Sequence, residues 1–123
     1  MRRMTFEFES VSLEVELLDT PTAEAIWQAL PLEGSALTWG EEVYFATPVS
    51  AELETTAREV VDPGTVCFWV QGNSLALPYG RTPASREDEC RLVTSVNILG
   101  EVEGDPRELE KIRDGDEIQV SAA

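Results

Sequence analysis

The sequence lacks histidine entirely, and it contains only two cysteines and one lysine among its 123 residues. The absence of imidazole excludes Ser-His-Asp triads and every acid–base scheme that relies on histidine near neutral pH. Cys67 and Cys90 stand too far apart, and without histidine partners, for the usual zinc-binding spacings. We therefore expect no metal and no cofactor. A disulfide is neither implied nor excluded, and Cys67 is predicted to be a buried strand residue.

Long hydrophobic runs are missing as well, since no stretch of about 18 apolar residues is present that could span a membrane. Two arginines open the chain, but Glu7 and Glu9 interrupt what would be the apolar part of a secretory signal peptide. We therefore expect a cytoplasmic protein. Apolar residues make up 42% of the chain, which predicts one folded domain over residues 1–123 with a single core.

Basic residues are scarce: nine Lys and Arg stand against 24 Asp and Glu, for a formal net charge of −15. Nucleic-acid binding depends on clustered cations that release counterions, so a nucleic-acid partner is excluded. Anionic membrane surfaces are disfavoured for the same reason. The acidic surface is predicted to be solvated rather than a functional patch.

Two segments near the N-terminus alternate between apolar and polar residues. Met4, Phe6 and Phe8 recur at every second position of residues 4–10, and residues 12–18 repeat the pattern. This period of two predicts a half-buried antiparallel pair. Further strands are predicted for residues 42–46, 65–72, 75–77, 92–102 and 117–120, and a weak strand with a loop for residues 51–64.

Two short helices are predicted, each with proline at its first position. The first covers about residues 21–30 with Thr20 as its cap, and the second begins at Pro106, is capped by Asp105 and stops at Gly115. The total is roughly eight short strands with two helices. That number favours a closed barrel over an open sheet, because closure removes sheet edges.

Side-chain direction alternates along a strand, and this separates neighbouring residues. In residues 65–71, Phe68 and Trp69 must point to opposite faces, so both cannot lie inside a barrel. Glu41 and Glu42 are separated in the same way. A paired acid–base mechanism is therefore not expected of them, and they are predicted to mark a turn and the start of a strand.

Several stretches resemble cyclophilins. NILGEVEGDPRELEKI (97–112) resembles the end of that fold, where a strand crosses a glycine turn into a helix, and FWVQGN (68–73) resembles the cyclophilin F-x-x-Q-G strand. The whole chain resembles a prokaryotic cyclophilin-like domain family of short bacterial and archaeal proteins without an established activity. That resemblance rests on TWGEEVYFATPV, REVVDPG, GNSLALPYGRTPAS and NILGEV. It implies a mainly β fold, a closed eight-stranded cyclophilin-like β-barrel with two short helices.

The resemblance does not carry over the isomerase chemistry of cyclophilins. Their key arginine belongs to an F-H-R motif ahead of F-x-x-Q-G, and here Pro63 occupies the arginine position and Asp62 the histidine position. Loss of one electrostatic donor of this kind typically costs about 100- to 1000-fold in rate. We therefore do not expect an active peptidyl-prolyl isomerase. Arg58 and Arg81 are the nearby arginines that could enter the groove from another direction.

Eight residues are candidates for ligand binding. The amides of Gln71 and Asn73 would bind a ligand or satisfy backbone groups at a barrel end. Arg81 would bind a carboxylate or form an internal salt bridge, and the aromatic residues would contact a ligand or fill the core. The candidates are Trp39, Tyr44, Phe68, Gln71, Gly72, Asn73, Tyr79 and Arg81.

The leading hypothesis is a module that binds an extended peptide or a small molecule, with Phe68 or Trp69 providing apolar contact. One alternative is a peptidyl-prolyl cis-trans isomerase that uses Arg58 or Arg81 as a relocated arginine. The other is a structural protein that forms homo-oligomers through exposed aromatic residues. A monomer and a homodimer both remain open.

Overall fold

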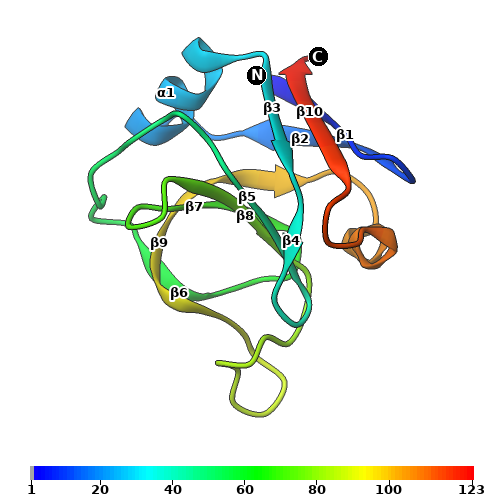
Figure 1. Cartoon of the computed structure of the whole chain (residues 1–123). Coiled ribbons are helices and arrows are strands. Elements are labelled where there is room, and N and C mark those ends of the chain that lie inside the picture. The colour runs from blue at the N-terminus through cyan, green and yellow to red at the C-terminus, as the bar shows by residue number, and fades with distance from the viewer. Residues whose placement is uncertain (1) are drawn as a thin grey trace.

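The computed structural model describes residues 2–123, and ten strands form the framework of that part of the chain (Figure 1). The strands are β1 (Arg3–Glu7), β2 (Ser12–Leu17), β3 (Leu32–Ser35), β4 (Leu37–Thr38), β5 (Glu42–Ala46), β6 (Arg58–Val61), β7 (Thr65–Trp69), β8 (Ser74–Pro78), β9 (Cys90–Val102) and β10 (Glu117–Ala122). The helices are the α-helix α1 (Pro21–Ala29) and the 3₁₀-helix η1 (Pro106–Lys111). The expectation of a mainly β fold is confirmed.

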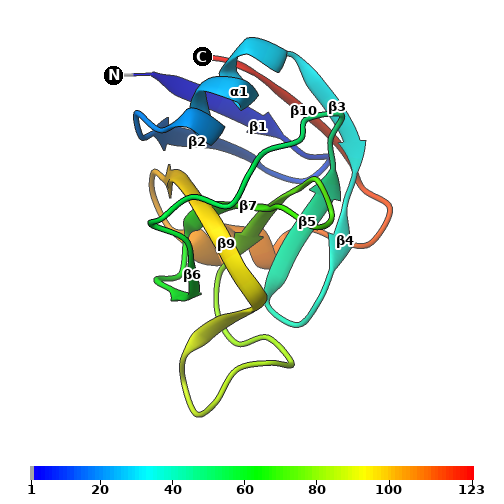
Figure 2. The same ribbon diagram turned by 90° about the vertical axis from the view of Figure 1, so that its left-hand side faces the viewer.

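The sheet nearly closes into a barrel (Figure 2). Its order is β3-β10-β1-β2-β9-β7-β8-β5-β4, and the two end strands are separated in the chain only by Ala36. The Ala36 N–H donates to the Asp116 carbonyl at 2.8 Å, and the Ala36 carbonyl accepts from the Gly115 N–H at 2.8 Å.

The expectation of a closed barrel with eight strands was wrong in its count, since the sheet has ten strands and closes only nearly. One reason is the interruption at Ala36, which divides residues 32–38 into β3 and β4. The other is β6, which pairs with β9 off the main path of the sheet.

The predicted N-terminal pair is confirmed as an antiparallel hairpin of β1 and β2. Met4 lies opposite Val15, and Phe6 lies opposite Leu13. All four side chains are buried, whereas Glu14, between Leu13 and Val15, is exposed. The period-two pattern therefore predicted correctly which side chains of the hairpin are buried in the core.

Buried side chains form two clusters on opposite faces of β7 and β8. The main core inside the barrel contains Phe68 of β7 together with Leu75 and Leu77 of β8. The opposite faces of the same strands present Cys67 and Ala76 to a second core. The members of this second core are Val61, Cys67, Ala76, Cys90, Leu92, Val96 and Ile98. The predicted opposition of Phe68 and Trp69 is confirmed, because only Phe68 belongs to the main core.

The first helix has the predicted cap, since the Thr20 hydroxyl accepts from the Ala23 N–H at 3.1 Å. The second begins at Pro106 as predicted, but it is a 3₁₀-helix that ends at Lys111, before Gly115. Leu109 and Ile112 are both buried, and a spacing of three residues matches the 3₁₀ repeat of three residues per turn. Among residues 2–123, no helix is long and apolar enough to cross a membrane.

Candidate functional site

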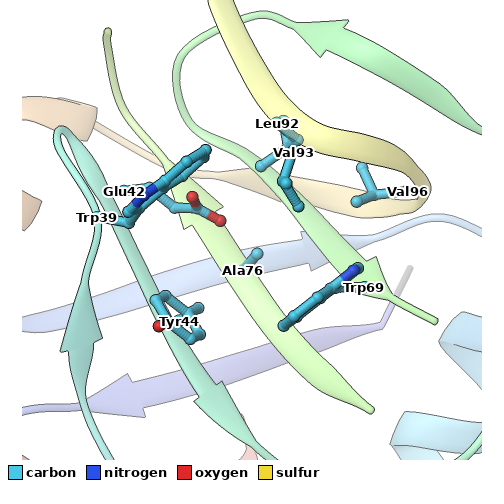
Figure 3. Close-up of a pocket in the computed structure, with 8 residues that line it drawn as sticks. All are labelled: Trp39, Glu42, Tyr44, Trp69, Ala76, Leu92, Val93 and Val96. Atoms are coloured by element: carbon cyan, nitrogen blue, oxygen red, sulfur yellow. The ribbon is translucent and has the colours of Figure 1, made fainter. Parts of the chain in front are cut away.

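A cavity of about 250 Å³ lies on the second-core face of the sheet, between β5, β8 and β7 on one side and the first half of β9 on the other (Figure 3). Its walls are almost entirely apolar. The lining residues are Trp39, Glu42, Tyr44, Trp69, Ala76, Leu92, Val93 and Val96. Ala76 lies at the floor, and the valines and leucine of β9 face the aromatic side chains across the open space.

Strand register produces this floor. Tyr44 of β5 pairs with Ala76 of β8, and Ala76 pairs in turn with Cys67 of β7. The three side chains therefore form one row on the same face. Because the central member of the row is an alanine, the space above it is not filled. The neighbouring Val43 and Phe45 point the other way, into the main core.

Three aromatic side chains border the cavity. The rings of Tyr44 and Trp69 meet edge to face, with centroids 6.5 Å apart and planes at 85°. Trp39 is held at the opposite side of the opening, where its backbone N–H donates to the Glu42 carbonyl at 3.0 Å. Each of the three is only half-buried, so the rings offer apolar surface to the cavity.

Glu42 is the one charged residue among those that line the cavity. Only 6% of this residue is exposed, and burial raises the pKa of its carboxyl to about 7. No side chain or backbone donor within residues 2–123 hydrogen-bonds to this carboxyl. Yet every completely buried polar side-chain atom in the described chain has a partner, so the Glu42 oxygens face the open cavity. Glu42 is therefore an acid that is near its titration midpoint at neutral pH.

Two thiols on other strands lie in the second core beside Glu42. The Cys67 thiol on β7 and the Cys90 thiol on β9 are both free and buried. Burial raises the pKa of Cys90 to about 11 and that of Cys67 further, and the charge of Glu42 contributes to both increases. Both therefore remain protonated at neutral pH. Arg58 on β6 acts weakly on the Cys67 thiol, and it does not line the cavity.

Two of the predicted site residues, Trp39 and Tyr44, line the cavity. A third, Gly72, lies against a lining residue, because a Cβ at this position would come within 2.3 Å of Cε3 in the Trp69 ring. The absence of a side chain thus allows the Trp69 ring to lie against the turn between β7 and β8.

The structure places the other predicted site residues elsewhere. Phe68 is fully buried in the main core, on the far side of β7 from the cavity. Gln71 is exposed in the turn after β7, and Asn73 is exposed in the same turn with a φ of 48°. Tyr79 is buried in the main core at 8% exposure, and Arg81 is an exposed residue in the loop that follows.

Sequence reasoning missed Glu42 as a site residue and treated it as the start of a strand. A signal was present, because the period of two in residues 42–46 places Glu42 on the same face as Tyr44. Trp69 could be assigned to the face opposite Phe68, but not to a cavity. The contributions of Leu92 and Val93 could not be inferred, since the path of β9 brings them to the site.

The positions that correspond to the cyclophilin catalytic motif lie in an exposed turn. Asp62 and Pro63 are both exposed, and the turn is closed by a hydrogen bond from the Thr65 N–H to the Asp62 carbonyl at 3.1 Å. Arg58 and Arg81 are also exposed. Within the described chain, the cavity is lined by no arginine and no lysine.

Comparisons with known proteins agree with this architecture. The Cyclophilin-like family model matches residues 2–121. The solution structure of the hypothetical protein AF2241 from Archaeoglobus fulgidus has a TM-score of 0.84 and 35% sequence identity, over 99% of this chain and 95% of that chain. The structure of McbB in complex with tryptophan is similar in fold, with a TM-score of 0.65 and 17% identity, over 96% of this chain and 44% of that chain. No curated protein matches the sequence.

Proposed function

The chain belongs to the Cyclophilin-like family, and on that premise we propose that it is a binding module whose ligand occupies the aromatic cavity between β5, β7, β8 and β9. The observation that carries this proposal is an apolar cavity with a single charged wall, the unpartnered carboxyl of Glu42. Ligand sites typically combine apolar and aromatic walls with a small number of placed polar groups.

The size of the cavity favours a small ligand or one side chain of a peptide. Its volume of about 250 Å³ falls just below the range of roughly 300–1,000 Å³ that is typical of sites for drug-sized molecules. A flat body would pack between Trp39 and Trp69, with Ala76 beneath it. McbB, a structural neighbour, is described in complex with tryptophan, and an amino acid with an aromatic side chain is therefore the first ligand to test here.

The proposal is binding without prolyl isomerisation. Cyclophilins twist a prolyl amide with an arginine donor aimed at the amide nitrogen, and among residues 2–123 no arginine lines the cavity. The two arginines considered as replacements, Arg58 and Arg81, are exposed and stand outside the cavity lining.

Indole NMR signals provide a direct test, because the chain has three tryptophans and only two of them line the cavity. Trp27 lies on α1 with the Arg2 guanidinium 5.1 Å from its ring centroid, so it serves as an internal control. Titration of ¹⁵N-labelled protein with tryptophan should shift the indole N–H signals of Trp39 and Trp69 and leave that of Trp27 unchanged. The Trp27→Phe variant identifies the Trp27 signal as the one that its spectrum lacks.

A cavity-filling variant provides the matched control. Ala76→Leu adds a side chain above the floor and should abolish the shifts, whereas Ala46→Leu on the exposed end of β5 should leave them intact. The proposed function would be overturned if neither tryptophan nor the phenyl probes described below shift the Trp39 and Trp69 signals of the unmodified protein. It would also be overturned if the shifts persist unchanged in Ala76→Leu.

A further inference from the structure

We propose that the ligand of this cavity is an organic cation, an ammonium or guanidinium group on an apolar or aromatic body, and that Glu42 is its counter-ion. The inference rests on the proposed function and adds the charge of the ligand. It stands on three features of the cavity: an unpartnered carboxyl, aromatic faces without a cation over them, and a lining without a positive group.

The first feature is the carboxyl. A buried carboxylate is costly unless it is paired and hydrogen-bonded, and neither an ion pair nor a hydrogen bond within residues 2–123 acts on the Glu42 carboxyl. The raised pKa agrees with this geometry, since desolvation is its only resolved cause. A bound cation would supply the missing charge-assisted hydrogen bonds, which are about twice as strong as neutral ones.

The second feature is the set of aromatic rings. Trp and Tyr faces attract cations within about 6 Å of the ring centroid. Elsewhere in the chain such faces are occupied: Arg2 lies over Trp27 and Arg107 over Tyr79, each at 5.1 Å. Among residues 2–123, no arginine or lysine lies over a ring that lines the cavity. These rings therefore retain their capacity to bind a cation from outside.

The third feature is the charge of the surroundings. Besides Glu42, the titratable groups of the second core are the Cys67 and Cys90 thiols, which are neutral at neutral pH. Arg58 on β6 acts on the Cys67 thiol but does not line the cavity. Glu41 precedes β5 and is paired with Arg107. An anionic ligand would meet no positive group in the lining and would enter a protein with a net charge of −15. A cation, in contrast, is attracted by the Glu42 carboxylate and by the negative net charge.

The test uses three probes that share a phenyl ring: phenethylamine, 2-phenylethanol and 3-phenylpropanoate. Calorimetry at pH 8, where Glu42 is ionised, should show phenethylamine binding at least tenfold more tightly than the alcohol, and the carboxylate should bind least. Glu42→Gln should remove the preference for the amine, whereas the control Glu41→Gln should retain it. A peptide with one lysine or arginine between glycines distinguishes a peptide side chain from a free amine as the source of the cation.

Proton release gives a second readout that a merely structural Glu42 would not move. With a pKa of about 7, Glu42 is mostly protonated at pH 6 and must ionise when a cation binds. Calorimetry in buffers with different ionisation enthalpies should show about 0.9 proton released per amine at pH 6 and about 0.1 at pH 8. Amine affinity should fall about tenfold for each pH unit below 7.

The outcomes separate this inference from the proposed function. Equal binding of amine and alcohol in the unmodified protein, with Trp39 and Trp69 signals still shifting, would overturn the cation and leave the binding module standing. Stronger binding of 3-phenylpropanoate than of phenethylamine would also overturn the cation as the ligand. If no probe binds and no Trp39 or Trp69 signal shifts, both the cation and the cavity as a ligand site fail.

Discussion

Glu41 and Glu42 are neighbours in the chain, yet their carboxyl groups lie in opposite electrostatic environments. The Glu41 carboxylate accepts from the Arg107 guanidinium at 2.8 Å and from the Arg81 N–H at 3.0 Å, and the bond with Arg107 is the main cause of its lowered pKa. Glu42 has no such partner, and burial raises the pKa of its carboxyl to about 7. Glu41 precedes β5 and Glu42 is its first residue, and Arg107 on η1 reaches only Glu41.

Stability should respond to pH through Glu42. Its pKa is raised from 4.5 to about 7 in the folded protein, so its contribution to stability is present below pH 4.5 and is lost as the pH rises to about 7. Glu42→Gln removes this loss. We expect its free energy of unfolding, relative to the unmodified protein, to increase by roughly 2 to 3 kcal/mol between pH 5 and pH 8.

Urea unfolding of both proteins at the two pH values measures this difference, because the other carboxyl groups titrate equally in each. Glu41→Gln should show little change over the same interval, since the lowered pKa of Glu41 places its titration at or below pH 4.5 in both the folded and the unfolded chain. If the difference in unfolding free energy between Glu42→Gln and the unmodified protein is the same at both pH values, the raised pKa of Glu42 is contradicted.

Gly72→Ala should disturb Trp69. The new Cβ would approach the indole to within 2.3 Å, which forces the ring away from the turn and from its edge contact with Tyr44. We expect a loss of about 1 to 3 kcal/mol in unfolding free energy and a changed near-ultraviolet circular dichroism signal. In a Trp69→Ala background the same change should have little effect. An equal loss in both backgrounds would assign the effect to the backbone.

Asn97 ties β9 to α1 and to the segment before β6. Its side chain is fully buried, donates to the Thr22 hydroxyl and the Glu52 carbonyl at 2.9 Å each, and accepts from the Glu54 N–H at 2.8 Å. Asn97→Ala removes the partner of the Glu52 carbonyl and of the Glu54 N–H and should cost about 2 kcal/mol. Hydrogen exchange at the Glu54 amide should be faster in Asn97→Ala than in the unmodified protein. Asn73→Gly, at an exposed position with a φ of 48°, is the control that should be nearly neutral.

Prolyl isomerase activity should not exceed the uncatalysed rate. Pro63 stands where the cyclophilin arginine belongs, and the other two candidates, Arg58 and Arg81, are exposed. A coupled assay on an Xaa-Pro peptide measures this directly. Turnover well above background that Arg58→Ala or Arg81→Ala abolishes would contradict the expectation and restore a relocated arginine.

Local periodicity determined much of the fold from the sequence. The alternation in residues 4–10 and 12–18 specified a hairpin and its buried face, and that in 65–71 placed Phe68 and Trp69 on opposite faces of β7. The cap at Thr20 specified where α1 begins. These features depend on residues close together in the chain, so their patterns are visible without knowledge of distant contacts.

Only the tertiary structure decided where the site lies. The cavity forms only because Leu92 and Val93 of β9 lie opposite the aromatic rings. Its floor is Ala76 of β8, a strand that pairs with β5 although β6 and β7 lie between them in the chain. The sequence also presented Glu41 and Glu42 as equivalent acids. Which of them remains unpaired depends on the position of Arg107, a residue 66 positions from Glu41, because a carboxyl loses its charge to desolvation only where no cation reaches it.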